Sequence, residues 1–176
     1  MADATAVYTI GHSTRPLEDF LALLKEHSIE RVADVRTVPG SRRHPQYGGQ
    51  ALAASLQAEG IDYRHLKALG GLRRPKPESP NGGWRNASFR GYADHMQTAE
   101  FESALEELIA LADERRTAVM CAEAVPWRCH RSLIGDALLV RGIPVLDVIG
   151  AGAAKPHRLT PFAAVEGTRV TYPPPA

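Results

Sequence analysis

The side chains that can do chemistry gather in one short segment of the chain. Between Cys121 and Arg131 the sequence carries two cysteines, one glutamate, two arginines and one histidine within eleven residues. The apolar run TAVMC, residues 117–121, ends at Cys121 and is typical of a strand buried on both faces. The pattern from Ser132 to Val140 predicts a helix after it. The segment therefore marks a candidate site at the junction of a buried strand and a helix.

Cys129 is the candidate nucleophile of this segment. If the helix begins near Cys129, its free backbone N–H groups and the positive end of its dipole face the thiol. Arg128, His130 and Arg131 add further donors, and such surroundings lower the pKa of a thiol and activate it. We therefore expect Cys129 to react, His130 or Glu123 to handle protons, and the two arginines to bind an anion.

The other cysteine and the glutamate each allow a plainer interpretation. Cys121 ends a buried apolar strand, where a thiol usually packs as a small hydrophobic side chain. Glu123 can act as a general base, or it can form an ion pair that orients Arg131 or Arg36. The chain has two cysteines, no apolar run long enough to span a bilayer, and no N-terminal signal pattern. We expect a cytoplasmic protein with two free thiols and no membrane partner.

The hydrophobic pattern predicts an α/β fold. Short β-favouring runs alternate with amphipathic stretches, as in a Rossmann-like, three-layer domain with a mainly parallel sheet between helices. A single domain spans residues 1–176, with its core at about 6–163 and an irregular, proline-rich tail at 164–176, where 168–172 could form an edge strand. Predicted strands cover 6–10, 32–35, 61–64, 117–121 and 143–149, and predicted helices cover 17–29, 51–58, 100–116 and 132–140.

Ligands of such sheets bind beyond the carboxyl ends of the strands. This rule brings three loops together. His12 and Ser13 follow the first strand, Asp34 and Arg36 follow the second, and residues 121–131 follow the fourth. Because Asp34 and Arg36 are two positions apart, both side chains leave the strand on the same face. We expect them to pair or to address one ligand together.

The loop after the second strand is rich in proline, glycine and arginine. Its Ser41 and Arg42 are placed to close over a phosphate or a nucleic-acid backbone. Aromatic residues near the arginine-rich loops, Tyr92 among them, could stack on bases or anchor the loops. The formal charge is only +1, so no global field attracts nucleic acid or an acidic membrane. Any nucleic-acid contact must therefore be local.

Several motifs together resemble those of a known family. They are YTIGHST, ADVRTVPGSRRHPQY, the LGG of Leu69 to Gly71, FRGYADHM, CAEAVPWRCHRS and PHRLTPFA. From Tyr8 to about Ala163, the chain resembles the bacterial and archaeal family catalogued as domain of unknown function 488. The resemblance implies an α/β domain and marks the Cys-x-Glu and Cys-His-Arg elements as a signature, but it implies no activity, substrate or cofactor. Ala124 departs from the basic residue that many members carry there.

The leading hypothesis is a cysteine-dependent hydrolase or transferase that acts on a phosphate-bearing or otherwise anionic small molecule, such as a nucleotide. Arg36, Arg128 and Arg131 would hold the anion. The second hypothesis is a nucleic-acid-binding or processing module, in which the arginine loops grip the backbone. The sequence indicates neither a cofactor nor an oligomeric state.

A metal site is the third hypothesis. Cys121, Cys129 and His130, or His12 in their company, could meet in space as ligands. Their spacing fits no short zinc motif, although catalytic zinc needs only three such ligands.

Overall fold

A computed structural model describes residues 5–40 and 43–175. Within these ranges the main sheet has six strands in the order β3-β2-β4-β1-β5-β6. The first five of these in the sheet order are parallel, and β6 is antiparallel to β5. The strands are β1 (Val7–Gly11), β2 (Arg31–Asp34), β3 (Asp62–His65), β4 (Thr117–Cys121), β5 (Val145–Val148) and β6 (Lys155–Pro156).

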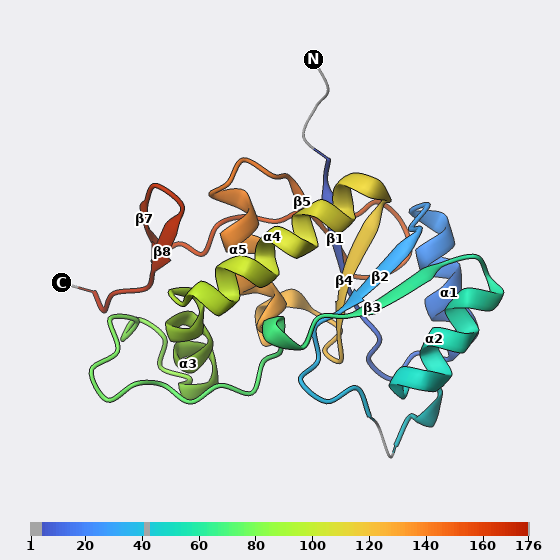
Figure 1. The fold of residues 1–176 in the computed structure, drawn as a ribbon, viewed down its shortest axis with the longest axis horizontal. Helices are drawn as coiled ribbons and strands as arrows, with labels where there is room; N and C mark the ends of the chain where they lie inside the picture. Colours follow the sequence, from blue (N-terminus) through green and yellow to red (C-terminus); the bar gives the residue numbers. More distant parts are fainter. Residues whose placement is uncertain (1–4, 41–42, 176) are drawn as a thin grey trace.

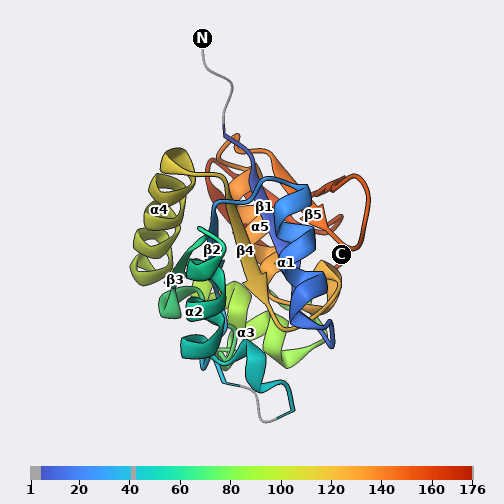
Figure 2. The ribbon, with the colours of Figure 1, turned by 90° about the vertical axis from the view of Figure 1, so that its right-hand side faces the viewer.

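Helices cover both faces of this sheet (Figures 1 and 2). One face packs against the first two helices, and the other packs against the last three. The helices are α1 (Leu17–Glu26), α2 (Gly49–Ala58), α3 (Ala87–Met96), α4 (Ala99–Glu114) and α5 (Arg131–Leu139). The three-layer α/β prediction is confirmed.

Burial follows the periodicity of each element. In α1, Phe20, Leu23 and Leu24 are buried at helical spacing, with polar residues turned to solvent. All five residues of β4 are buried, because helices cover both faces of this central strand. The predicted strands and helices agree with the observed ones to within a few residues.

Helix α3 is an element that our sequence analysis did not assign. Asn86 caps it by accepting hydrogen bonds from the backbone N–H groups of Ser88 and Phe89. Tyr92 and Met96 are buried on its inner face. A cap residue followed by apolar residues at helical spacing was the available signal, and the glycine-rich and proline-rich stretch before it obscured that signal.

The tail is more regular than expected. Strands β7 (Ala164–Glu166) and β8 (Arg169–Thr171) form a separate antiparallel hairpin, seen at the end of the ribbon beside the C-terminus (Figure 1). Tyr172 follows the hairpin and is fully buried, and its hydroxyl donates to Asp136 of α5 over 2.7 Å. The predicted strand at 168–172 is present as β8, but it pairs with β7 rather than with an edge of the main sheet. The buried Tyr172 holds this segment against the core.

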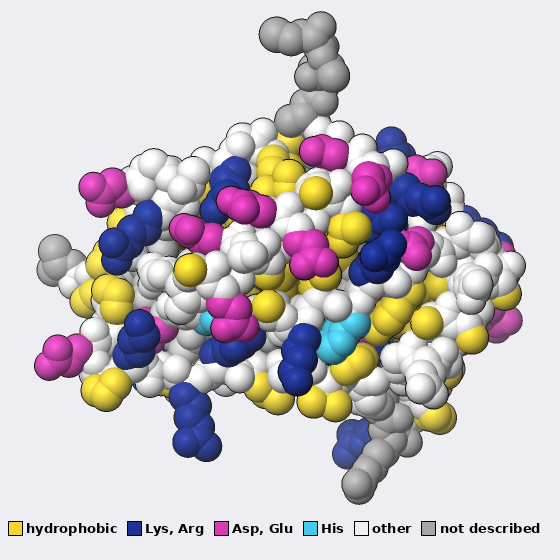
Figure 3. Space-filling model, viewed as in Figure 1, with side chains coloured by type: hydrophobic (Ala, Val, Ile, Leu, Met, Phe, Trp, Pro, Cys, Tyr) yellow, Lys and Arg dark blue, Asp and Glu magenta, His cyan; other side chains and the backbone are white. Residues whose placement is uncertain are grey.

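Basic and acidic side chains are interspersed on the face shown in Figure 3. This mixing agrees with a formal charge of +1. Among the residues that the structure describes, no helix has both the length and the apolar character needed to cross a bilayer.

Candidate functional site

A cavity of about 560 Å³ lies at the carboxyl ends of the parallel strands. Loops after β1, β2 and β4 line it together, as the topology predicts. The stretch after the short helix η2 (Lys67–Leu69) and the start of α3 complete the wall. The predicted site residues in this lining are His12, Arg36, Cys121, Glu123, Arg128, Cys129 and His130.

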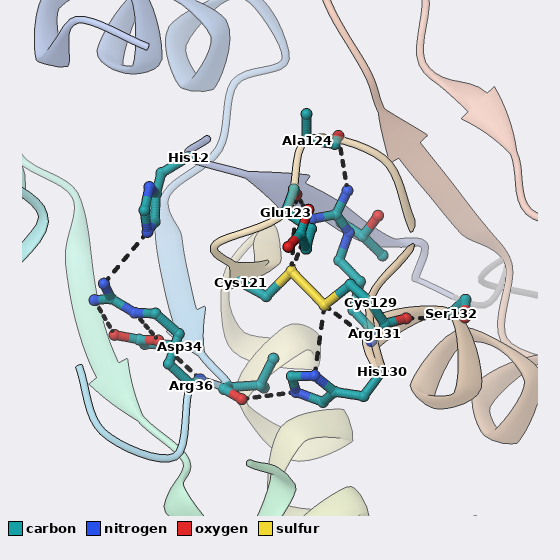
Figure 4. The surroundings of a disulfide bond; sticks show 12 residues. His12, Asp34, Arg36, Cys121, Glu123, Ala124, Cys129, His130, Arg131 and Ser132 are labelled. Carbon is teal, nitrogen blue, oxygen red and sulfur yellow. Dashed lines mark hydrogen bonds and ion pairs between the residues drawn. A yellow bond between two sulfur atoms is a disulfide. The ribbon is translucent and has the colours of Figure 1, made fainter. Parts of the chain in front are cut away.

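The two cysteines are bonded to each other. Cys121 and Cys129 form a disulfide in this cavity (Figure 4). Cys121 is 2% exposed and Cys129 is 6% exposed. The expectation of two free thiols is wrong, because the fold brings the end of β4 against the turn before α5. Cys121 packs in the core as predicted, but it also presents its sulfur to the site.

The helix after the site begins at Arg131, one residue before the predicted span of 132–140. His130 is the N-cap of α5, and Cys129 follows the short helix η3 (Pro126–Arg128). The sulfur of Cys129 still accepts from a helix N-terminus, since the backbone N–H of Arg131 donates to it over 3.5 Å. The predicted link between Cys129 and the helix end is therefore present at the side chain.

His130 has its two ring nitrogens in different roles. Nε2 lies 2.8 Å from the carbonyl oxygen of Val35, and Nδ1 lies 3.4 Å from Cys129 Sγ (Figure 4). Because a carbonyl only accepts, Nε2 carries the proton and the lone pair of Nδ1 faces the sulfur. Burial lowers the pKa of His130 to about 4, so the ring is neutral near pH 7.

Arg131 is turned into the protein rather than toward a ligand. It is fully buried, and Nη1 donates to the carbonyl of Glu123 over 2.6 Å and to Cys121 Sγ over 3.0 Å. Nη2 donates to the carbonyl of Ala124 over 3.0 Å. Burial lowers its pKa to about 10, so it keeps its charge. Arg131 thus shapes the 122–124 loop and contacts a site sulfur, and it does not line the cavity.

Asp34 and Arg36 form a closed pair. Nε and Nη2 of Arg36 donate to the two carboxylate oxygens over 2.9 and 2.7 Å, and the Tyr63 hydroxyl donates to the same carboxylate over 2.5 Å. Asp34 is fully buried. The predicted pairing on one face of the strand is present. Arg36 therefore reaches the cavity with its charge largely neutralised.

His12 extends this network. Its Nδ1 donates to the carbonyl of Ser13 over 2.9 Å, so its Nε2 accepts from Arg36 Nη1 over 3.4 Å. Its ring stacks on Tyr47 with centroids 4.3 Å apart. Burial, together with the Arg36 charge, lowers the pKa of His12 and favours the neutral ring.

Other predicted residues lie away from the cavity wall. Ser13 adopts a positive φ of 50° and bonds the loop after β4 through its backbone, but its side chain does not line the cavity. Tyr92 is fully buried, and its hydroxyl donates to the carbonyl of Leu69. The prediction that Tyr92 stacks on a base is wrong, because α3 turns the ring into the core. Ser41 and Arg42 lie outside the described residues.

Two exposed charges and an apolar rim face the cavity. Among the described residues, the Arg128 and Glu123 side chains have no hydrogen-bond or ion-pair partner, and both residues line the cavity. Val38 and Leu72 also line it and are 70% and 80% exposed. Such exposure of large apolar side chains beside a polar pocket favours a ligand with both an anionic and an apolar part.

Gly71 is a site residue that our reasoning missed. A Cβ at this position would lie 2.6 Å from His130 Nδ1, so only glycine leaves the ring in place. Gly11 has a similar role, since a Cβ there would overlap the Glu123 carbonyl that Arg131 holds. The LGG and IGH motifs were visible in the sequence, but only the fold shows what each glycine touches.

A family model described as domain of unknown function DUF488 matches residues 16–138. The chain belongs to this family. The matched range contains the LGG motif, the two cysteines and His130, and it leaves out His12 and β5. No curated protein matches the chain. The family description names no activity.

A metal centre at the cysteines finds no support in the geometry. Within residues 5–40 and 43–175, no three His, Cys, Asp or Glu side chains are arranged to hold a metal ion. Cys121 and Cys129 bond each other, His130 Nε2 is turned to Val35, and His12 Nε2 faces an arginine.

Proposed function

We propose that this protein is a cysteine-dependent enzyme, a transferase or hydrolase in type, that acts on a small anionic molecule. Cys129 is the nucleophile and His130 takes its proton. The observation that carries the proposal is the His130 ring, which is oriented by the Val35 carbonyl and presents an unprotonated nitrogen to Cys129 Sγ. A nucleophile, a base and a group that orients the base are the parts that covalent catalysis needs.

The enzyme works in its reduced form. Reduction of the Cys121–Cys129 bond returns a thiol to Cys129, which can donate a hydrogen bond to His130 Nδ1. Because the pKa of His130 is about 4, its ring accepts the proton only as the sulfur attacks. The Arg131 backbone N–H then stabilises the thiolate at the helix N-terminus. The proposed setting is the cytoplasm, where thiols are kept reduced.

Arg128 is the proposed contact for the anion. It lines the cavity, and it is the exposed arginine there, while Arg36 is occupied by Asp34. Phosphate, carboxylate or a nucleotide phosphate can each accept from a guanidinium. Glu123, also exposed in the cavity, is the second candidate for proton transfer.

One argument for the nucleic-acid hypothesis was that aromatic side chains near the arginine-rich loops could stack on bases, and two of these side chains are not free to do so. Tyr92 is buried, and Trp84 is occupied by a stacked Phe89 with centroids 4.9 Å apart. A small molecule is a better supported ligand than a nucleic acid, because Arg128, Glu123 and Cys129 converge on one pocket at the strand ends.

Alkylation kinetics test the proposal. In reduced Cys121→Ser protein, iodoacetamide should label Cys129 at least about tenfold faster at neutral pH than it labels the free thiol N-acetylcysteine. Inorganic phosphate and adenosine monophosphate should each slow the labelling. Mass spectrometry of peptides confirms that the label is on Cys129.

Matched variants separate the roles. His130→Gln should slow labelling of Cys129, and Arg128→Ala should abolish protection by anions. Arg158→Ala is the control, because Arg158 is exposed and lies outside the cavity lining. Labelling of Cys129 no faster than that of N-acetylcysteine, with no effect of either anion, would refute the nucleophile and the anion site.

A further inference from the structure

The guanidinium of Arg131 is in direct contact with the sulfur of Cys121. Nη1 of the fully buried Arg131 lies 3.0 Å from Cys121 Sγ. Among the described residues, Arg131 has no carboxylate within ion-pair distance, and its Nε has no hydrogen-bond partner. A buried guanidinium without a counter-charge is costly. A thiolate on Cys121 would supply that counter-charge at an atom that Nη1 already faces.

We propose that Cys121 is the resolving thiolate for Cys129 and that the substrate is a small anionic organic disulfide. This inference deepens the proposed function and rests on it, because Cys129 must be the nucleophile. It adds the group that is transferred to Cys129, which is one RS half of the disulfide, and the second protein sulfur, which displaces that group as a thiolate. Arg131 is the positioning residue that holds Cys121 in its charged form.

The position of Cys121 beside Cys129 favours a mixed disulfide as the covalent intermediate. A covalent group on Cys129 has the Cys121 sulfur as its immediate neighbour, since the structure pairs these two cysteines with each other. Hydrolysis of an acyl or phosphoryl group would need water in that place. A mixed disulfide instead offers a sulfur that the Cys121 thiolate can attack. The product is the Cys121–Cys129 bond that the structure contains.

The two steps balance. The Cys129 thiol attacks one sulfur of the substrate while its proton passes through His130 Nδ1 to the first thiolate, which leaves as a thiol. The Cys121 thiolate then attacks Cys129 Sγ and expels the second thiolate, which is protonated from water. One disulfide and two protein thiols give one protein disulfide and two small thiols. A thiol reductant returns the enzyme by the reverse exchange.

The cavity favours an organic disulfide over a peroxide. Its volume of about 560 Å³ far exceeds the roughly 30 Å³ that a water-sized molecule occupies. Arg128 provides a contact for an anionic group, and the exposed Val38 and Leu72 provide apolar contacts for the body of the ligand. A disulfide with carboxylate groups meets both requirements.

The test uses reduced full-length protein with oxidised glutathione as the anionic disulfide and cystamine as the cationic one. Wild type should form the Cys121–Cys129 bond and release two glutathione thiols per chain. Cys121→Ser should stop with one glutathione on Cys129, and Cys129→Ser should react far more slowly. Arg128→Glu should reverse the preference between the two disulfides, and Arg158→Glu should not.

The ionisation of Cys121 tests the role of Arg131. In Cys129→Ser protein, the thiol pKa of Cys121, followed by thiolate absorbance, should fall from the ordinary value of about 8.5 to below about 7. Adding Arg131→Gln should restore the ordinary value, and Arg131→Lys should keep it low. If the arginine variants do not fold, the pKa in the single Cys129→Ser variant decides alone.

Two results overturn the inference. One is an ordinary Cys121 pKa, and the other is a wild-type protein that stays glutathionylated or unoxidised. If Cys129 is still alkylated quickly with anion protection, the inference fails while the proposed function stands. If Cys129 is alkylated no faster than N-acetylcysteine, the proposed function itself fails.

Discussion

At the scale of single residues, the site depends on a contact between a glycine and a histidine. His130 holds the Val35 carbonyl with one nitrogen and faces Cys129 with the other. Gly71 lies against the same ring, on the side of Nδ1. The ring therefore keeps its orientation only while position 71 has no side chain.

Replacing Gly71 with alanine should impair the site. The new Cβ would lie 2.6 Å from His130 Nδ1, so the ring must rotate away from Cys129 or the 71–72 backbone must shift. We expect alkylation of Cys129 in the reduced protein to slow by about tenfold or more, a loss typical when a general base is misplaced. Gly40→Ala is the matched control, since Gly40 lines the same cavity and its Cβ would meet no atom of the described residues within 4 Å. Equal rates in the two variants would contradict this prediction.

At the scale of elements, helix α3 organises the loop that precedes it. Asp94 accepts from the Lys76 backbone N–H, the Ser79 hydroxyl and the Asn81 amide, over 2.8, 2.5 and 2.7 Å. Asn81 in turn accepts from the backbone N–H of Tyr172. One buried carboxylate therefore ties the 76–81 loop to α3 and, through Asn81, to the tail.

Asp94→Asn should loosen this loop. The amide carries no charge and can accept at only one atom, so about 2–4 kcal/mol of unfolding free energy should be lost. Urea unfolding measures the loss, and a glutamate-specific protease should cleave faster after Glu78, which is exposed in this loop. Asp113→Asn is the control, because Asp113 is exposed on α4. Unchanged cleavage after Glu78 would show that the loop is ordered by other contacts.

At the scale of the whole molecule, a buried ionic cluster joins the sheet, α5 and the tail. His157 lies between Asp136 and Asp147, with its ring nitrogens 3.0 and 3.1 Å from their carboxylates. Both ring nitrogens face acceptors, so the ring is an imidazolium. The two carboxylates outweigh the effect of burial and raise the pKa of His157 to about 9.

Stability should therefore fall in alkaline solution. The folded pKa of about 9 exceeds the ordinary value of about 6.5, so the folded state binds this proton more tightly. The contribution is fully present below about pH 6.5 and is lost as pH rises through about 9, and it amounts to about 3 kcal/mol.

Urea midpoints measured between pH 6 and pH 10 check this dependence. His157→Gln should be less stable at pH 6 and should have a flatter profile over that range. His27→Gln, at a half-buried histidine outside the cluster, should keep the wild-type profile. An equally steep profile in His157→Gln would assign the dependence to other groups.

The sequence by itself determined the alternation of strands and helices and the place of the site. Period and burial dictate each element locally, and parallel strands must present their carboxyl ends at one edge, so His12, Arg36 and the 121–131 segment had to converge. Strand geometry also placed Asp34 and Arg36 on one face, but it left open whether they pair or address one ligand together. Helix α3 was not assigned from the sequence, because the proline-rich stretch before it obscures the signal of its N-terminus.

Only the tertiary structure decided what each side chain of the site contacts. Whether Arg131 faces a ligand or a sulfur depends on a loop from a different strand, and whether Tyr92 is exposed depends on which face of α3 the core covers. The contact between Gly71 and His130 joins positions far apart in the chain. Local patterns carry no information on such distances, because packing between elements sets them.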